Sequence, residues 1–158
     1  MALHRGKGFE SKFSECWRKS FPKGFVYRIP DRMSGYREVS QNPYDFFAFA
    51  NGRLFLVECK SHKGNSFPIS NHKVFPQYSR LVSYMGLDGV HPGVMLWLEE
   101  KDLVAWLPIE SLVRMKEELG LKSVNSDMIR DGEYGIIEIP SKKLRVFMDS
   151  DYRIMKDL

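Results

Sequence analysis

Residues 45–60 read DFFAFANGRLFLVECK, two apolar runs separated by Asn51-Gly52. Asn-Gly between such runs is the strongest short-range signal for a two-residue hairpin, because a type I′ turn needs positive φ at both central positions. If Ala50 pairs with Arg53, the pairing places Asp45 opposite Glu58 on one face of the hairpin. The stretch therefore predicts a β-hairpin with two carboxylates facing each other.

Side-chain alternation adds a third charged group to this face. Lys60 lies on the face of Glu58, whereas Cys59 points to the other side. Directly opposed side chains have Cβ atoms about 4.5–5.5 Å apart, and like charges there are unfavourable. Because Mg²⁺ prefers one or two carboxylates with waters and substrate phosphate, the group suits metal-dependent phosphodiester hydrolysis.

A plain surface salt pair is the alternative interpretation, since Glu-x-Lys is common on exposed strands. The apolar residues around the pair argue against it. Both faces of the hairpin are apolar, which is typical of a central strand covered on two sides. Ionisable groups in such a place are rarely left without a partner, so we favour the catalytic interpretation.

Length and composition describe one globular domain spanning residues 1–158, with 43% hydrophobic residues available for a core. No apolar run approaches a membrane span, and the first residues lack the apolar region of a signal peptide. The two cysteines, Cys16 and Cys59, form no disulfide framework and no metal-type spacing. We expect a cytoplasmic protein with reduced thiols, in a bacterial or phage-infected cell.

Charge is distributed unevenly along the chain. Residues 1–80 carry 14 Lys and Arg against 6 Asp and Glu, whereas residues 81–158 carry 10 against 14. The basic half contains the opposed carboxylates, as expected if a polyanion approaches them. The charge asymmetry favours a nucleic-acid partner over a role in solubility alone.

The remaining periodicity predicts an α/β or α+β layered domain, with helices flanking a central mixed sheet. Pro108 is expected to open a helix that ends near Gly120. A polar segment at about 29–43 is predicted to be a loop or a projecting arm. The elements we expect are helices at 7–20, 75–85 and 108–120, and strands at 25–29, 93–98, 103–107, 134–139 and 144–148.

Asp45 followed thirteen residues later by Glu58-x-Lys60 on a hairpin resembles the PD-(D/E)xK nuclease superfamily. Two further stretches are similar to the RecU-type Holliday junction resolvases: GKGFE at residues 6–10, and SFPISN at residues 66–71 followed by Gln77. The resemblance covers roughly residues 6–80 and implies a restriction-endonuclease-like core.

The resemblance also implies roles for individual residues. Asp45, Glu58 and the backbone carbonyl of Cys59 would bind Mg²⁺ or Mn²⁺, and Lys60 would position the attacking water and offset charge on the phosphoryl oxygens. Glu10 would reach the site from the first helix. Gln77 would assist from the helix after the hairpin.

Departures from the family pattern occur at Leu56, where an extra acidic residue is usual, and at Pro76, where a histidine is expected before the glutamine. The segment at 28–43 is also shorter than the arm that such resolvases project into a junction. Its mixture of basic and aromatic residues suits phosphate contact and base stacking. The candidate DNA contacts are Arg28, Arg32, Tyr36 and Arg37 in and before this segment, and Lys63 and Lys73 beyond the hairpin.

The function we expect is a homodimeric, Mg²⁺-dependent endonuclease that resolves four-way DNA junctions by paired symmetric nicks. Two opposed strands require two sites related by a twofold axis. One alternative is a nuclease of the same superfamily that acts on duplex or flapped DNA. The other is a DNA-binding protein without catalysis, which predicts binding that depends on salt but not on metal.

Three scattered histidines, His62, His72 and His91, lack the spacing of a metal site. The tryptophans at 17, 97 and 106 lie in apolar runs and are expected in the core. Asp149 and Asp151 are acidic but lack a matching carboxylate, so no catalytic role is assigned to them.

Overall fold

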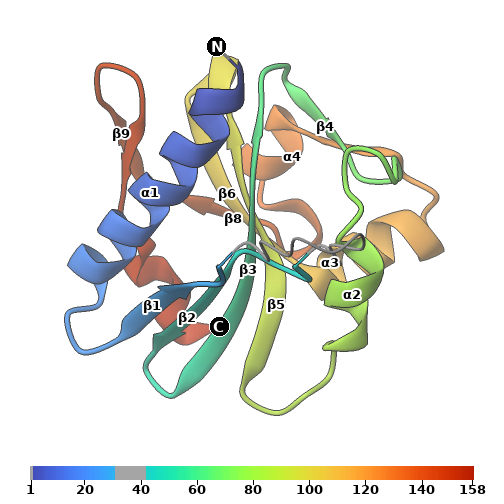
Figure 1. The fold of residues 1–158 in the computed structure, drawn as a ribbon. Helices are drawn as coiled ribbons and strands as arrows, with labels where there is room; N and C mark the ends of the chain where they lie inside the picture. The colour runs from blue at the N-terminus through green and yellow to red at the C-terminus, as the bar shows by residue number, and fades with distance from the viewer. Residues whose placement is uncertain (1, 31–41) are drawn as a thin grey trace, which may run out of the picture.

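The computed structural model describes residues 2–30 and 42–158. Within these ranges six strands form one sheet in the order β1-β2-β3-β5-β6-β8 (Figure 1). Neighbouring strands are antiparallel except β3 and β5, which run parallel. The bounds are β1 Phe25–Arg28, β2 Phe46–Ala50, β3 Arg53–His62, β5 Val90–Leu98, β6 Leu103–Pro108 and β8 Ile137–Ile139.

The predicted hairpin is confirmed. Ala50 pairs with Arg53, and both turn residues have positive φ, 51° at Asn51 and 76° at Gly52. Positive φ at both positions is the type I′ geometry, whose twist matches that of the flanking strands. The turn therefore sets the register of β2 against β3 and places β3 inside the sheet.

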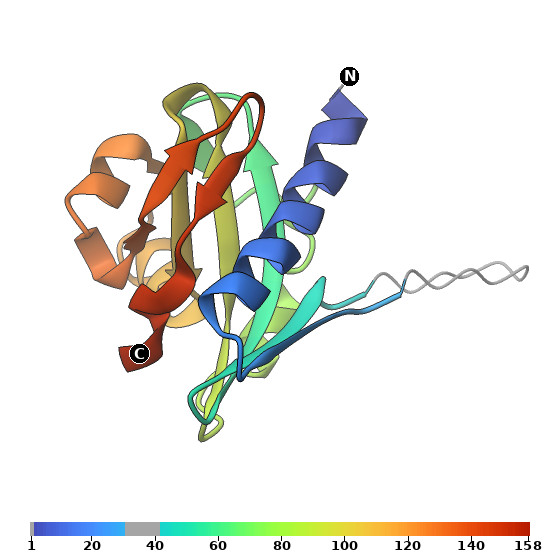
Figure 2. The ribbon, with the colours of Figure 1, turned by 90° about the vertical axis from the view of Figure 1, so that its left-hand side faces the viewer.

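Helix α1 (Ala2–Ser20) covers one face of the sheet, and the shorter helices cover the other (Figures 1 and 2). Phe9, Phe13, Cys16 and Trp17 recur on one side of α1, and all are at most 4% exposed. Their spacing is that of an amphipathic helix, as the sequence predicts. We call the two faces the α1 face and the α2 face.

The α2 face is covered by α2 (Tyr78–Ser83), α3 (Ile109–Val113) and α4 (Ser126–Arg130). The predicted helix at 75–85 is thus shorter than expected. Pro108 is the cap before α3 (φ −57°, ψ 143°) and not its first residue, since its extended ψ lies outside the helix. The helix continues through a wider segment, Arg114–Glu118, and ends before Gly120, whose φ is +66°.

Several late predictions are corrected. Residues 144–147 form the turn of a hairpin between β9 (Ser141–Lys143) and β10 (Met148–Ser150), not the predicted strand. The strand expected from 134 starts only at Ile137, because Tyr134 has a φ of 56°. The strand β4 (Ser66–Pro68) and its partner β7 (Ser123–Asn125) were not expected, since their pairing joins distant parts of the chain.

The β9–β10 hairpin lies beside α1 on the α1 face (Figure 2). Met148 and Tyr152 join the same core as Phe13, and the Phe13 ring meets Tyr152 at 5.2 Å between centroids. No described helix is long and apolar enough to cross a membrane. Mixed strands flanked by helices on two faces confirm the expected α+β class.

Candidate active site

The two carboxylates lie at the end of the hairpin away from its turn. Glu58 is on the central strand β3, and Asp45 immediately precedes β2. The backbone amide of Asp45 donates to the carbonyl of Val57, which is the partner of Phe46, so the ladder shifts by one residue there. Asp45 therefore lies beside Glu58. It is not the paired residue directly opposite Glu58, which is where the extrapolated register had placed it.

The side chains of this pair nevertheless meet. Each carboxyl group is close enough to change the pKa of the other. Asp45 Oδ2 accepts a hydrogen bond of 2.9 Å from the backbone amide of Cys59. Lys60 Nζ lies 3.4 Å from Glu58 Oε1. The predicted group of two carboxylates and one ammonium is thus brought together.

Burial shapes the electrostatics of the pair. Glu58 is only 4% exposed. This burial, and then the charge of Asp45, raise the pKa of Glu58 well above its ordinary value, while Lys60 opposes the rise. Burial also raises the pKa of Asp45, but the Cys59 amide and Lys60 counteract it. The environment of the pair therefore favours the protonated form of Glu58 more strongly than that of Asp45.

Cys59 presents only its backbone to this group. Its side chain belongs to the core under α1, as alternation along β3 requires. Burial, followed by the negative charges of Asp45 and Glu58, raises the pKa of the thiol well above its ordinary value. The thiol is therefore a neutral core group.

Glu10 approaches the same region from α1. Its Oε2 accepts a hydrogen bond of 3.1 Å from Arg28 Nε, and its charge contributes to the raised pKa of Cys59. Arg28, at the end of β1, is close enough for its charge to lower the pKa of Asp45. Sequence reasoning proposed both residues but missed their pairing, which joins positions 18 residues apart.

Gln77 is the N-cap residue of α2, but its side chain makes no capping hydrogen bond. Phe75, two residues earlier, lies 6.0 Å from Lys60 Nζ, measured to the ring centroid. The Gln77 Oε1 atom is buried and has no hydrogen-bond partner among the residues that the structure describes. An unsatisfied buried acceptor calls for a donor such as an ordered water. The role of Phe75 was missed, and only its apolar position at the start of the helix predicted at 75–85 could have indicated it.

The candidate DNA contacts are spread around this region. Lys63 follows β3, and Lys73 lies in the turn before α2; both are exposed. The Arg28 side chain is 40% exposed. Arg32, Tyr36 and Arg37 lie outside the described residues, as does most of the segment predicted to project at about 29–43.

The donor set fits a hydrated divalent cation. Across the described ranges, no three His, Cys, Asp or Glu side chains form a metal-binding group. Asp45 and Glu58 would thus be the only side-chain carboxylates, with a backbone oxygen and waters completing the shell. Few carboxylates and several waters are typical of Mg²⁺, and a cation would relieve the repulsion between the buried Glu58 and the partly buried Asp45 when both are ionised.

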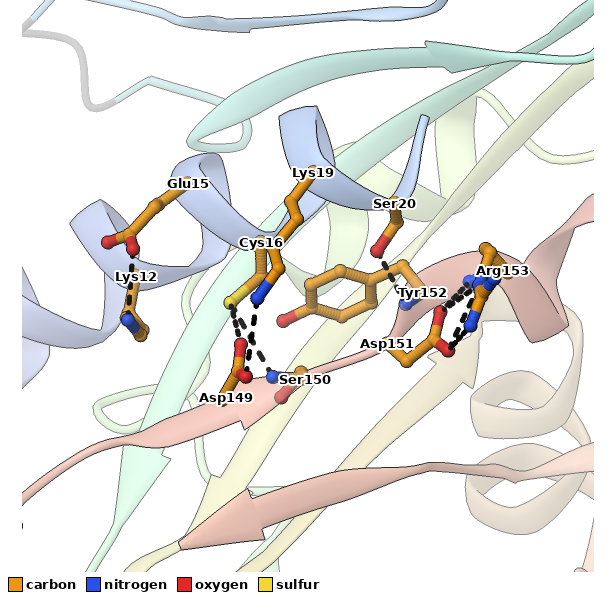
Figure 3. Close-up of polar contacts among 10 residues, drawn as sticks. All are labelled: Lys12, Glu15, Cys16, Lys19, Ser20, Asp149, Ser150, Asp151, Tyr152 and Arg153. Atoms are coloured by element: carbon orange, nitrogen blue, oxygen red, sulfur yellow. Dashed lines mark hydrogen bonds and ion pairs between the residues drawn. The ribbon is translucent and has the colours of Figure 1, made fainter. Parts of the chain in front are cut away.

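Asp149 and Asp151 have structural contacts on the α1 face (Figure 3). Asp149 accepts a hydrogen bond from Cys16 Sγ and lies 3.5 Å from Lys19 Nζ, which fastens β10 to α1. Asp151 pairs with Arg153. A cavity of about 500 Å³ opens between these elements, but none of the candidate site residues lines it.

The tryptophans lie in the core, as expected, and no histidine belongs to a metal-binding group among the described residues. His62 packs edge-on against Phe67, and His91 stacks on Phe55. Trp17, Trp97 and Trp106 are at most 1% exposed.

Comparison with known proteins supports the fold. No family model matches the chain. No curated protein matches it either. Among solved structures, the chain is similar to Hjc of Archaeoglobus fulgidus, described as a Holliday junction resolvase from an archaeal hyperthermophile, with a TM-score of 0.56 and 19% identity over 84% of this chain and 95% of that one.

At this identity the likeness establishes the architecture alone. The expected restriction-endonuclease-like core, a mixed sheet flanked by helices, is confirmed. The finer resemblance to RecU-type enzymes stays a prediction.

Proposed function

We propose that this protein is a metal-dependent endonuclease that resolves four-way DNA junctions by paired symmetric nicks. One observation carries the proposal: the buried carboxylate of Glu58 and the partly buried carboxylate of Asp45 lie beside the ammonium of Lys60 at the end of the central hairpin. The likeness in fold to a protein described as a Holliday junction resolvase supports the choice of branched DNA.

Asp45, Glu58 and the carbonyl of Cys59 would hold Mg²⁺ or Mn²⁺. When bound, the ion would supply Lewis-acid stabilisation of the phosphoryl oxygens and a water of lowered pKa. The Cys59 amide fixes the orientation of Asp45 through its 2.9 Å hydrogen bond. Because the pKa of Glu58 is raised, metal binding would favour release of a proton from it, since a ligating carboxylate must be ionised.

Lys60 has two tasks in this proposal. Its ammonium orients the attacking water and offsets negative charge that develops on the phosphoryl group. The side chain is held between Glu58 and the Phe75 ring and is only 19% exposed, so its position is restricted. Such preorganised charge is worth more in a partly buried site than in water.

Glu10 and Arg28 would act together next to this group. Arg28 lies at the end of β1, where it lowers the pKa of Asp45 and contacts Glu10. We assign Arg28 a phosphate contact, with Glu10 positioning its guanidinium, and Lys63 and Lys73 further phosphate contacts. Gln77 would hold a water through its buried Oε1 atom.

Resolution of a four-way junction cuts two strands, so we propose a homodimer with two such sites related by a twofold axis. The excess of basic residues in the first 80 positions favours a DNA partner.

The decisive experiment compares labelled four-way junction, flap and linear duplex DNA in Mg²⁺, Mn²⁺ or EDTA, with Glu58→Gln and Asp45→Asn as controls. We expect symmetric nicks in the junction that need metal and both carboxylates, while the variants still bind DNA. Comparable cutting of all three DNAs would favour a general nuclease of this fold. Binding without cleavage would favour the non-catalytic alternative, and cleavage by either variant would move the active site elsewhere.

A further inference from the structure

Strand β1 lies at the edge of the sheet (Figure 1) and carries two exposed aromatic side chains. Phe25 is 51% exposed and Tyr27 is 55% exposed. Within residues 2–30 and 42–158 they are the only aromatic members of the exposed large hydrophobic residues. Exposed aromatic rings close together mark a surface that contacts a partner.

Both rings lie on the same sheet face as the candidate catalytic group. Val26, between them, packs in the core under α1, so Phe25 and Tyr27 point to the α2 face. They pair in register with Phe49 and Phe47, and Phe47 packs in the core of the α2 face. Glu58 and Lys60 occupy this face too, because they alternate with the side chain of Cys59.

Tyr27 is close to the carboxylates along the sheet. It pairs with Phe47, and Asp45 lies two residues before Phe47, so Tyr27 and Asp45 are diagonal neighbours. The amide of Ile29 donates to the carbonyl of Asp45, which joins the two strands at this point. Diagonal neighbours on one face are roughly 7–8 Å apart. That separation is about two base steps of duplex DNA, at roughly 3.4 Å per step.

Phe25 shows that an aromatic ring on this edge strand can stack. Phe25 stacks on Phe49 with an interplanar angle of 11° and centroids 5.3 Å apart. Aromatic side chains on a sheet bind bases of any sequence, because every base has a π-face. A base can reach them only when it is unpaired or unstacked, as at the branch point of a junction.

We infer that Tyr27, with Phe25 behind it, is a stacking surface for unstacked bases of the DNA strand next to the phosphate held at Asp45 and Glu58. The inference rests on the proposed function and names the part of the substrate that the site recognises. DNA is the occupant we choose because the surface is continuous with the carboxylate site and belongs to the basic half of the chain. A second copy adding to the β1 edge is the competing occupant, and the experiment separates the two.

The test uses the full chain in EDTA with four-way junction DNA that carries 2-aminopurine at successive positions from the branch point, and with a matched linear duplex. Wild-type protein should quench the fluorescence of 2-aminopurine near the branch point. Tyr27→Ala should abolish this quenching and weaken junction binding about 5- to 100-fold, the range expected for loss of a stacked base. Tyr27→Phe should keep both. Ile154→Ala, which removes a similarly exposed apolar side chain on the α1 face, should behave as wild type.

Equal weakening of junction and duplex by Tyr27→Ala, or quenching that survives it, would overturn the inference. So would loss of self-association by Tyr27→Ala in sedimentation, since the surface would then join two copies. Cleavage of the same junction by wild type in Mg²⁺ tests the proposed function separately. Quenching without metal-dependent cleavage would refute the proposed function but support the stacking surface. Cleavage without quenching would support the proposed function and refute the stacking surface.

Discussion

Replacing Glu58 by glutamine should stabilise the metal-free protein while abolishing its proposed activity. Glu58 is 4% exposed and meets the carboxyl group of Asp45. Glutamine keeps the shape of the side chain and, at alkaline pH where both carboxyl groups are ionised, removes one of two like charges. The change therefore tests whether repulsion between the carboxylates of Asp45 and Glu58 destabilises the metal-free protein.

The magnitude follows from the charges in contact. Two unit charges about 4 Å apart repel by about 4 kcal/mol at an effective dielectric constant of about 20. Lys60, 3.4 Å from Glu58, and the Cys59 amide offset part of this repulsion. We expect Glu58→Gln to raise the free energy of unfolding by about 1–3 kcal/mol at alkaline pH, which is the part of the repulsion left after this offset. For a chain of this length the midpoint should rise by about 2–10 °C.

The gain should depend on pH in a defined direction. In the unfolded chain the carboxyl group of Glu58 loses its proton near its ordinary pKa of 4.5, whereas burial keeps the proton on in the folded protein to higher pH. The native state then binds more protons than the unfolded state, so wild-type stability falls as pH rises through this window. Glutamine has no proton to lose. The two proteins should thus unfold alike at about pH 4.5 and diverge towards pH 8.5.

Thermal unfolding monitored by circular dichroism in EDTA across this pH range measures the effect, with Glu118→Gln as the control on an exposed surface. Millimolar Mg²⁺ should then stabilise wild type but not Glu58→Gln, because a ligand stabilises the state that binds it. Equal or lower stability of Glu58→Gln at high pH in EDTA would refute the repulsion on which this reasoning depends. Equal stabilisation of both proteins by Mg²⁺ would place the cation elsewhere.

Three further changes test other parts of the structure. Lys60→Ala should lower the single-turnover cleavage rate by about 100-fold or more with a much smaller change in Mg²⁺ affinity, and unchanged turnover would make the lysine a structural partner only. Gly52→Ala should lower the free energy of unfolding in urea by about 1–2 kcal/mol because φ is +76° there, whereas Asn51→Gly should be nearly neutral; the reverse order would contradict the turn. Burial and then Glu117 raise the pKa of Tyr78 from its ordinary value of 10.0 to about 12. The free energy of unfolding of wild type should therefore fall between pH 10 and pH 12, and that of Tyr78→Phe should fall less, as measured by ultraviolet-monitored unfolding.

Local chemistry explains why the sequence alone predicts the centre of the fold. Asn51-Gly52 forms its turn from two residues that tolerate positive φ, and alternation then assigns each residue of β2 and β3 to a face. The spacing of Phe9, Phe13 and Trp17 likewise requires a helix with one buried side. These features depend on neighbours within a few positions, and the structure confirms them.

The strands β4 and β7 and the turn at 144–147 were less predictable because each depends on contacts with residues far away in the sequence. β4 pairs with β7, which lies more than fifty residues away, and neither strand has strong periodicity of its own. The turn at 144–147 replaces an apolar run that resembled a strand, since Phe147 packs against Trp97 under α1. Tertiary contacts override local preference at such places.

The site shows the same division. The sequence by itself determined that Glu58 and Lys60 share one face of a buried strand, because that follows from alternation. Only the tertiary structure decided that Asp45 departs from the regular pairing of β2 with β3 and accepts a hydrogen bond from the Cys59 amide. It also decided that Arg28, which pairs with Glu10 of α1, lies near Asp45. Register along one hairpin is a local property, whereas the approach of α1 and β1 to its end depends on how the whole core packs.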